Sequence, residues 1–155
     1  MKIEELKSFV QEIVKEATKL KNKHTDEKTA AVNYACIFSQ KDEQYADLIE
    51  TVKKFGKVVE ETPKGPLFQI QPLETVSGTL QLLKIRIPDV TRPERGDADF
   101  TVSDYENFKE KYLSQKGFKL MKKREDFEML ELMDEKFDVR VYFSDPPMDK
   151  QLGIK

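Results

Sequence analysis

The feature that most constrains the fold of this chain is an order of structural signals that occurs twice. In each copy, an apolar strand-like run leads into a helix-like period, a glycine and three further strand-like runs. Matching positions in the two copies include Ser39 with Ser103 and Gly56 with Gly117. Identity between the copies is low, so the repeat is one of pattern. The sequence therefore predicts an α+β fold in which two tandem βαβββ units form a curved, mostly antiparallel sheet.

Local signals predict where these elements begin and end. Ser39 is expected to cap the first helix, and Gly56 to end it in a left-handed conformation. Ser103 and Glu106 have the spacing of a capping box before a second helix, which is expected to stop at Gly117. The expected strands are residues 30–38, 57–62, 67–73, 79–87, 97–102, 118–125, 127–133 and 137–143.

An amphipathic helix is expected ahead of the repeat. Apolar residues recur there at three- and four-residue steps between charged ones, which is the pattern of a helix with one buried stripe. The stripe consists of Ile3, Leu6, Val10, Ile13, Val14, Ala17 and Leu20. We therefore divide the chain into the N-terminal helix (1–24), the first unit (25–89), the second unit (90–147) and a C-terminal tail (148–155).

The charge balance excludes several classes of partner. Lys and Arg number 27 against 29 Asp and Glu, so there is no excess positive field to attract a nucleic acid. No apolar run approaches the roughly 20 residues that cross a bilayer, so we expect no membrane association. The single cysteine, Cys36, cannot form an internal disulfide, and the N-terminus does not have the pattern of a signal peptide. These features predict a cytoplasmic protein.

The predicted strands place polar side chains in step along one face of the sheet. Successive side chains on a strand point to opposite faces, so if the helices cover the apolar set, the polar set lines a concave face and forms a pocket of mixed charge. The polar set is Asn33, Gln69, Gln71, Lys84, Arg86, Asp97, Asp99, Glu131, Asp138, Arg140 and Tyr142. The first strand is ambiguous, because both of its faces are largely apolar around Asn33. The alternative is that the whole set is the solvated face of an antiparallel sheet.

No motif in the sequence identifies a reaction, so the catalytic residues stay unknown. The only histidine, His24, lies in a polar connection, which argues against a His-based zinc pair and against a Ser-His or Cys-His dyad. Cys36 is expected to pack in the core. The sequence contains no Gly-rich phosphate-binding motif. Asp99 and Glu131 would be an acid and a base if both faced one pocket, and ordinary surface carboxylates are the alternative.

Four segments carry a resemblance to a known family. They are the N-terminal helix, residues 29–35 (TAAVNYA), residues 85–88 (IRIP) and the junction at residues 92–100 (RPERGDADF). Together with the tandem βαβββ pattern, they make the chain resemble the vicinal oxygen chelate superfamily of glyoxalases, bleomycin resistance proteins and dioxygenases. Within it, the chain is most similar to the YecM-type proteins, a group with an assigned metal-binding role.

The resemblance implies a metal on the concave face, held by His or Glu residues from the first and fourth strands of each unit. The corresponding positions in this chain are Asn33, Arg86, Asp99 and Tyr142. Of these, only Asp99 is an ordinary ligand for a divalent ion, and a guanidinium cannot bind one. We therefore expect the scaffold of the family without its metal and without a cofactor. Arg86 is expected to take the place of the cation, within ion-pair distance of Asp99 or Glu131.

The leading hypothesis is a protein that binds a small polar or anionic molecule on the concave face through Arg86 and Arg140, because guanidinium groups pair well with carboxylates and phosphates. The expected ligand-binding residues are Asn33, Arg86, Asp99, Glu131, Arg140 and Tyr142. One alternative is a metal-dependent lyase, isomerase or dioxygenase that uses Asp99 and Glu131. The other is an interaction module, in which the N-terminal helix docks a partner chain or a second copy in a homodimer.

Overall fold

The computed structural model describes residues 1–124 and 126–153, and the predicted α+β fold of two βαβββ units is confirmed. The N-terminal helix is α1 (Ile3–His24). The first unit consists of β1 (Ala31–Phe38), α2 (Asp42–Val52), β2 (Gly56–Glu60), β3 (Leu67–Thr75) and β4 (Gly78–Arg86). The second consists of β5 (Gly96–Thr101), α3 (Tyr105–Tyr112), β6 (Phe118–Arg124), β7 (Phe127–Leu132) and β8 (Val139–Asp145), and α4 (Met148–Gln151) follows it. The predicted end of one strand at residue 125 lies outside the described residues.

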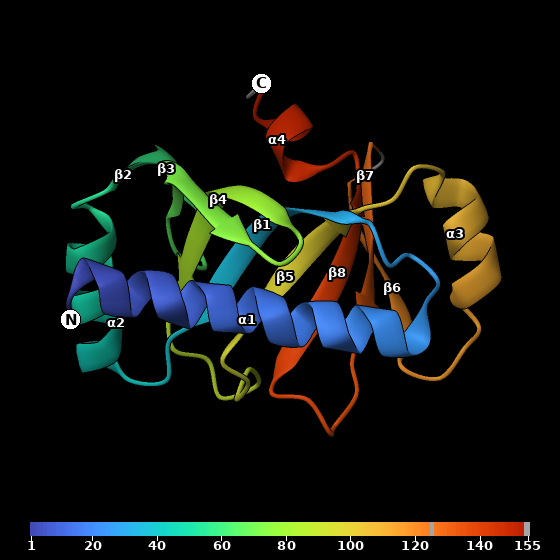
Figure 1. The fold of residues 1–155 in the computed structure, drawn as a ribbon, viewed down its shortest axis with the longest axis horizontal. Coiled ribbons are helices and arrows are strands. Elements are labelled where there is room, and N and C mark those ends of the chain that lie inside the picture. The colour runs from blue at the N-terminus through green and yellow to red at the C-terminus, as the bar shows by residue number, and fades with distance from the viewer. Residues whose placement is uncertain (125, 154–155) are drawn as a thin grey trace.

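The strands form a single eight-stranded sheet in the order β2-β3-β4-β1-β5-β8-β7-β6 (Figure 1). Read outward from the centre, the first unit gives β1-β4-β3-β2 and the second gives β5-β8-β7-β6, so the two halves repeat one arrangement. Pairing is parallel within each unit between β1 and β4 and between β5 and β8. The units are joined by the antiparallel pair β1 and β5 at the middle of the sheet.

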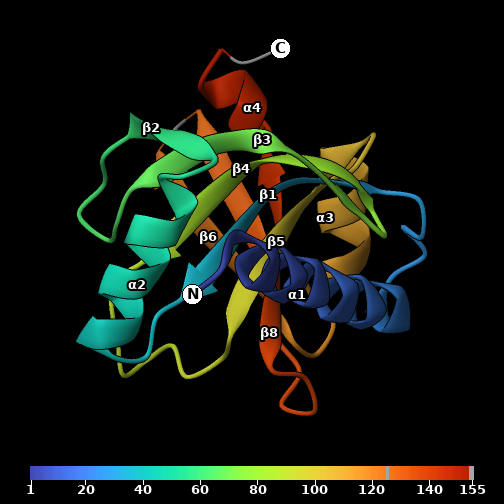
Figure 2. The same cartoon turned by 60° about the vertical axis from the view of Figure 1, so that its left-hand side comes forward.

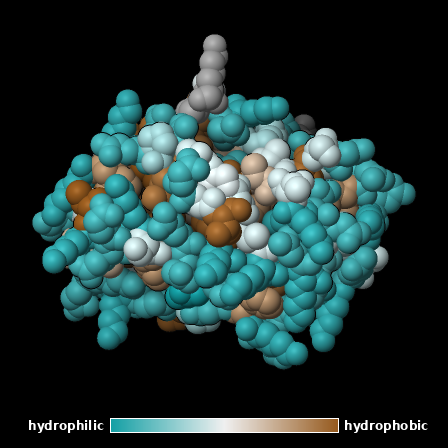
Figure 3. Space-filling model, in the orientation of Figure 1, coloured by the Kyte–Doolittle hydropathy of each residue, from teal (hydrophilic) through white to brown (hydrophobic). Residues whose placement is uncertain are grey.

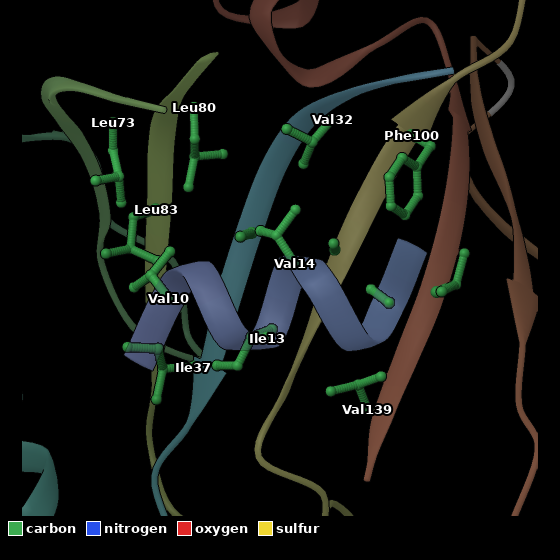
Figure 4. Close-up of a cluster of buried hydrophobic side chains, with 14 of the residues drawn as sticks. Val10, Ile13, Val14, Val32, Ile37, Leu73, Leu80, Leu83, Phe100 and Val139 are labelled. Carbon is green, nitrogen blue, oxygen red and sulfur yellow. The ribbon is translucent and has the colours of Figure 1, made fainter. Parts of the chain in front are cut away.

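The helices α1, α2 and α3 cover one face of this sheet. α1 crosses the middle, while α2 flanks the first unit and α3 the second (Figures 1 and 2). In the close-up view, Val10, Ile13 and Val14 of α1 lie over strand residues that include Ile37 and Leu83 (Figure 4). The main hydrophobic core of the molecule therefore lies between the helices and the sheet.

The apolar stripe predicted for the N-terminal helix is buried within the chain itself. From Leu6 to Leu20 its members are at most 1% exposed, and Ile3 packs at the edge of the same core. The outer surface over this face is mostly hydrophilic, with hydrophobic residues in small separate patches (Figure 3). The stripe is thus not a free docking surface.

Two of the predicted helix caps differ from the structure. Ser39 does not cap α2, because its backbone N–H donates to the carbonyl of Arg86 and the chain runs on before the helix begins. The cap of α3 is Asp104 in place of Ser103, and its side chain accepts a hydrogen bond of 3.2 Å from the backbone N–H of Asn107. The hydroxyl of Ser103 and the carboxylate of Asp104 are both suited to cap the N-terminus of α3, and the carboxylate is the group that reaches the free backbone N–H.

The two helix-ending glycines have different functions. Gly117 has a φ of 96°, as expected for a left-handed stop. Gly56 does not have a positive φ and is instead the first residue of β2. A Cβ at Gly56 would lie 2.9 Å from the carbonyl oxygen of Gln69, so this glycine is required by the close approach of β3.

The segment expected to be a tail returns to the sheet. α4 forms directly after the two prolines, and Met148 and Leu152 pack against a small apolar cluster that includes Tyr34, Cys36 and Leu82. This cluster lies on the face opposite α1, which we call the concave face. Across the described ranges, no helix has the length and apolar character needed to span a membrane.

Candidate functional site

The predicted alternation of side chains along the strands is present in the structure. Ala98, Phe100, Val141 and Phe143 belong to the core under the helices, and the residues between them face the other way. On the concave face, the buried polar residues are Asp97, Asp99, Glu131, Arg140 and Ser144, with Lys84 and Arg86 partly buried beside them. Burial of this many polar groups excludes a merely solvated sheet face for the central strands.

A β-bulge resolves the ambiguity of the first strand. The pairing register of β1 with β5 shifts between Val32 and Tyr34, which inserts Asn33 as an extra residue. The amide of Asn33 donates to Asp99 at 3.2 Å and to Thr101 at 3.0 Å, while Tyr34 also turns toward the concave face. Asn33 thus holds Asp99 in place, and Tyr34 occupies the position that a simple alternation assigns to a core residue.

A cavity of about 160 Å³ opens on the concave face, and one end of it is charged. Three cationic side chains surround this end: Lys84 and Arg86 from β4, and Arg92 from the loop before β5. The only carboxylate of the described lining is Asp97. We call these four residues the charged end of the cavity; with Asp97 ionised, they carry an excess of positive charge.

The rest of the cavity is largely apolar. Its other lining residues are two tyrosines, Tyr34 and Tyr142, and the apolar residues Met121, Phe127, Met129 and Met148, which we call the apolar wall. A second cavity of about 560 Å³ adjoins it and shares Lys84, Phe127 and Met148 with it. Residues of α4 and of the turn between β2 and β3 complete the second cavity.

Asp97 is the most unusual group of the charged end. Its side chain is buried, and Oδ1 has no hydrogen-bond partner among the described residues. Burial, together with the neighbouring carboxylate of Asp99, raises the pKa of Asp97 to about 7, although the cations Arg92, Lys84 and Arg86 act in the opposite direction. A carboxyl group that titrates near neutral pH beside an open cavity is suited to bind or exchange a proton.

This raised pKa makes stability depend on pH in a defined direction. Folded Asp97 keeps its proton up to pH about 7, whereas an unfolded Asp loses it near pH 4. The folded state therefore binds more protons between these values, and the free energy of unfolding falls as pH rises through this window. We expect Asp97→Asn to remove much of this fall, measured as urea midpoints at pH 5 and pH 8. An equal fall in both proteins would show that Asp97 is ionised throughout, and Asp138→Asn, at an exposed carboxylate, is the control.

Asp99 lies beneath the cavity and is fully engaged by protein groups. Its Oδ1 accepts from the backbone N–H of Ser144 at 3.1 Å and from Asn33, and its Oδ2 accepts from the Ser144 hydroxyl. Burial raises the pKa of Asp99 to about 6, and the hydrogen bonds from Ser144 and Asn33 limit the rise. Asp99 therefore links β1, β5 and β8 and is not part of the cavity lining.

Glu131 and Arg140 belong to a second buried network. Arg140 donates through Nε to Glu94 at 2.9 Å, through Nη1 to Glu131 at 3.4 Å and through Nη2 to the Thr91 carbonyl at 2.8 Å. Glu131 also accepts from the hydroxyl of Tyr142 at 2.6 Å. Each nitrogen of the Arg140 guanidinium thus has a protein partner, and the network fixes the loop before β5 to β7 and β8.

Arg86 is on the concave face, but the predicted ion pair is wrong. Its Nη2 pairs with Asp89 at 3.1 Å, three residues along the chain, in place of Asp99 or Glu131. The Nε of Arg86 is buried and has no hydrogen-bond partner among the described residues. The cation beside Glu131 is instead Arg140.

These residues do not fit the divalent metal that the fold family implies. In the described ranges, no three His, Cys, Asp or Glu side chains are grouped as metal ligands. Asp99 and Glu131 already accept hydrogen bonds from protein donors, and Arg140 lies where a cation would neutralise Glu131. The donor set is therefore that of an ion-pair network.

The structure brings only part of the predicted set into one cavity. Arg86 and Tyr142 line it, while Asn33, Asp99, Glu131 and Arg140 form the polar layer beside and beneath it. Lys84 and Asp97 belonged to the predicted polar face without being singled out. The alternation of side chains along strands did not predict Arg92 or Tyr34 as cavity residues. Arg92 lies on a loop, to which alternation does not apply, and the bulge in β1 changes the face on which Tyr34 lies.

Comparisons with known proteins support the fold. No family model matches the sequence, and no curated protein matches it significantly. A solved structure described as "Structural Genomics, Protein EC4020" is similar with a TM-score of 0.71 and 11% identity, over 94% of this chain and 88% of that chain. At this identity the likeness establishes a shared fold alone.

Two further solved structures are less similar. A glyoxalase/bleomycin resistance protein/dioxygenase superfamily member from Vibrio splendidus 12B01 has a TM-score of 0.45 and 13% identity, over 75% of this chain and 98% of that chain. Methylmalonyl-CoA epimerase from Mycobacterium tuberculosis has a TM-score of 0.41 and 10% identity, over 74% of this chain and 86% of that chain.

The order of strands in the sheet agrees with the tandem βαβββ arrangement that makes the sequence resemble the superfamily. Two βαβββ units share one sheet, with their first strands paired at the centre. The chain thus has the vicinal oxygen chelate fold, and the resemblance is confirmed at this level. The closer similarity to the YecM-type proteins stays a prediction.

Proposed function

We propose that the protein binds a small anionic molecule in the cavity on the concave face. The observation that carries this proposal is the convergence of Lys84, Arg86 and Arg92 on a space that also contains an ionisable carboxyl group. Positive groups gathered around a partly enclosed cavity attract an anion, and guanidinium groups bind carboxylate and phosphate oxygens through paired hydrogen bonds.

Arg92 is the strongest candidate for direct contact. Its Nη1 donates to the hydroxyl of Tyr142 at 2.7 Å, and the guanidinium lies 5.5 Å from the ring centroid of Phe38. These contacts orient the side chain and leave further N–H groups for a ligand, since a guanidinium has five donors. Arg140, which the sequence suggested, has a partner on each guanidinium nitrogen and is better suited to support the loop that carries Arg92.

The test is anion binding by wild-type protein and by Arg92→Met. Inorganic phosphate is the probe, and isothermal titration calorimetry at low salt measures the dissociation constant. A hydrogen bond to a charged group contributes roughly 1.5–3 kcal/mol, so we expect Arg92→Met to weaken binding by about tenfold to a hundredfold.

The matched control is Arg95→Met. Arg95 lies three residues along the same loop and pairs with Asp138 at 3.2 Å, with 35% of its side chain exposed. The Arg95→Met variant loses the same charge at a site outside the cavity. Its dissociation constant for phosphate should stay within about twofold of the wild-type value. Equal losses in the two variants would indicate nonspecific attraction to net charge. If wild-type protein binds neither phosphate nor small organic carboxylates, the proposal fails.

The proposed ligand site favours neither alternative from the sequence. A metalloenzyme using Asp99 and Glu131 is disfavoured, because both carboxylates are engaged by protein donors. An interaction module using α1 is disfavoured, because its apolar stripe is buried. A cytoplasmic location remains part of the proposal, supported by the single buried thiol of Cys36.

A further inference from the structure

We infer that the ligand is a small organic acid with a hydroxyl or amino group beside its carboxylate and an apolar chain beyond it. The inference rests on the proposed anion site and adds two requirements, one from Asp97 and one from the apolar wall. Each requirement follows from a separate feature of the cavity.

The first requirement is a hydrogen-bond donor next to the anionic group. Buried polar atoms in native proteins are nearly always paired, so an unpaired one calls for an explanation. Asp97 lines the cavity, and its buried Oδ1 has no partner among the described residues. A simple anion would be repelled by this carboxylate. An acid with a neighbouring hydroxyl or amino group would place its carboxylate near the cations and its donor near Asp97.

The second requirement is an apolar part. The cavity is also lined by the three methionines and Phe127 of the apolar wall, and Met121, Phe127 and Met129 belong to one apolar cluster. Methionine side chains are flexible and polarisable, so they adapt to an aliphatic chain. An inorganic anion or a fully polar acid would leave this wall without a complementary surface.

The size of the two cavities supports an elongated molecule. The first cavity, at about 160 Å³, is smaller than the roughly 300–1,000 Å³ typical of ligand pockets. The adjoining cavity of about 560 Å³ shares Lys84, Phe127 and Met148 with the first. A ligand whose head fills the charged end would extend past Phe127 and Met148 toward α4, with Lys84 along its side.

Three carboxylates separate the two requirements. They are 2-hydroxyhexanoate, hexanoate, which lacks the hydroxyl group, and 2-hydroxypropanoate, which lacks most of the chain. Calorimetric titrations at pH 8.5 keep Asp97 ionised, because its pKa is about 7. One hydrogen bond to a charged acceptor corresponds to about tenfold in affinity, and burial of three methylene groups to at least tenfold. We expect 2-hydroxyhexanoate to bind about tenfold tighter than each of the others.

The variant that tests the role of Asp97 is Asp97→Val, which places an apolar side chain of similar size there and removes the acceptor. We expect its affinities for 2-hydroxyhexanoate and hexanoate to become equal, with hexanoate binding tighter than to wild-type protein because the repulsion is gone. Asp138→Val removes a carboxylate of the same charge at an exposed site and should keep the wild-type preference. If Asp97→Val does not fold, the preference of wild-type protein for 2-hydroxyhexanoate over hexanoate still tests the requirement for a donor group.

The outcomes separate the inference from the proposed function. Phosphate binding that depends on Arg92, with equal affinity of wild-type protein for 2-hydroxyhexanoate and hexanoate, would overturn the inference and leave the anion site standing. A hydroxyl preference that persists in Asp97→Val would also overturn it. If neither phosphate nor any of the three acids binds wild-type protein, the proposed function fails, and the inference fails with it.

Discussion

Replacing Arg140 with Met is expected to lower the free energy of unfolding by about 3–5 kcal/mol, because the change leaves two carboxylates buried without their cation. The side chains of Arg140, Glu131 and Glu94 are 10%, 8% and 14% exposed. Methionine fills similar space, so most of the loss would come from charge. Urea unfolding followed by far-UV circular dichroism measures it.

The same chain offers a control and a rescue for this variant. Arg95→Met breaks the pair with Asp138, whose side chain is 59% exposed, and exposed pairs contribute about 1 kcal/mol or less. Adding Glu131→Gln to Arg140→Met should recover part of the loss, since one of the unpaired charges is then removed. If Arg140→Met and Arg95→Met lose the same small amount, the buried network is not the source of stability that its geometry indicates.

Replacing Val14 with Asp should abolish the cooperative unfolding transition at 25 °C. Val14 is fully buried at the centre of α1, over the middle of the sheet (Figure 4). The change loses roughly 1.5–3 kcal/mol of apolar burial and adds an unpaired buried charge that costs several more. Together these approach the entire stability of about 5–15 kcal/mol of a typical domain.

Lys15→Asp is the matched control, because it introduces the same residue one position further along α1 on the exposed side. It should change the urea midpoint only slightly. If Val14→Asp unfolds at the same urea concentration as Lys15→Asp, α1 is not docked on the sheet in solution. Its stripe would then be available to a partner chain, and the interaction-module hypothesis would regain support.

The sheet faces were predictable from sequence because alternation along a strand is a local property. Val139, Val141 and Phe143 alternate with Arg140 and Tyr142, and each side chain lies on the face that the alternation assigns. The same reasoning failed at Tyr34, because the bulge that reorients it arises from pairing with β5, a strand more than 60 residues away. Local pattern thus identified the concave face but not all of the side chains on it.

The ion pairs were not predictable, because charge partners depend on loop geometry. Arg86 pairs with Asp89 in the loop that follows its strand, and Arg140 pairs with Glu94, which lies 46 residues away in sequence. Lys, Arg, Asp and Glu make up 36% of the chain, so every cation has many eligible partners. The path of the loop before β5 places Arg92 in the cavity lining. The same path brings this loop within hydrogen-bond distance of Arg140.

The position of α4 has a consequence for how this protein would diverge in evolution. α4 supplies Met148 to both cavities and Gln151 to the larger one, while the sheet beneath is assembled without it. Segments outside the sheet accept insertions and deletions at less structural cost than strands do. A change in the length of α4 would therefore change the volume of both cavities in one step, while the charged end and the folding core kept their sequence.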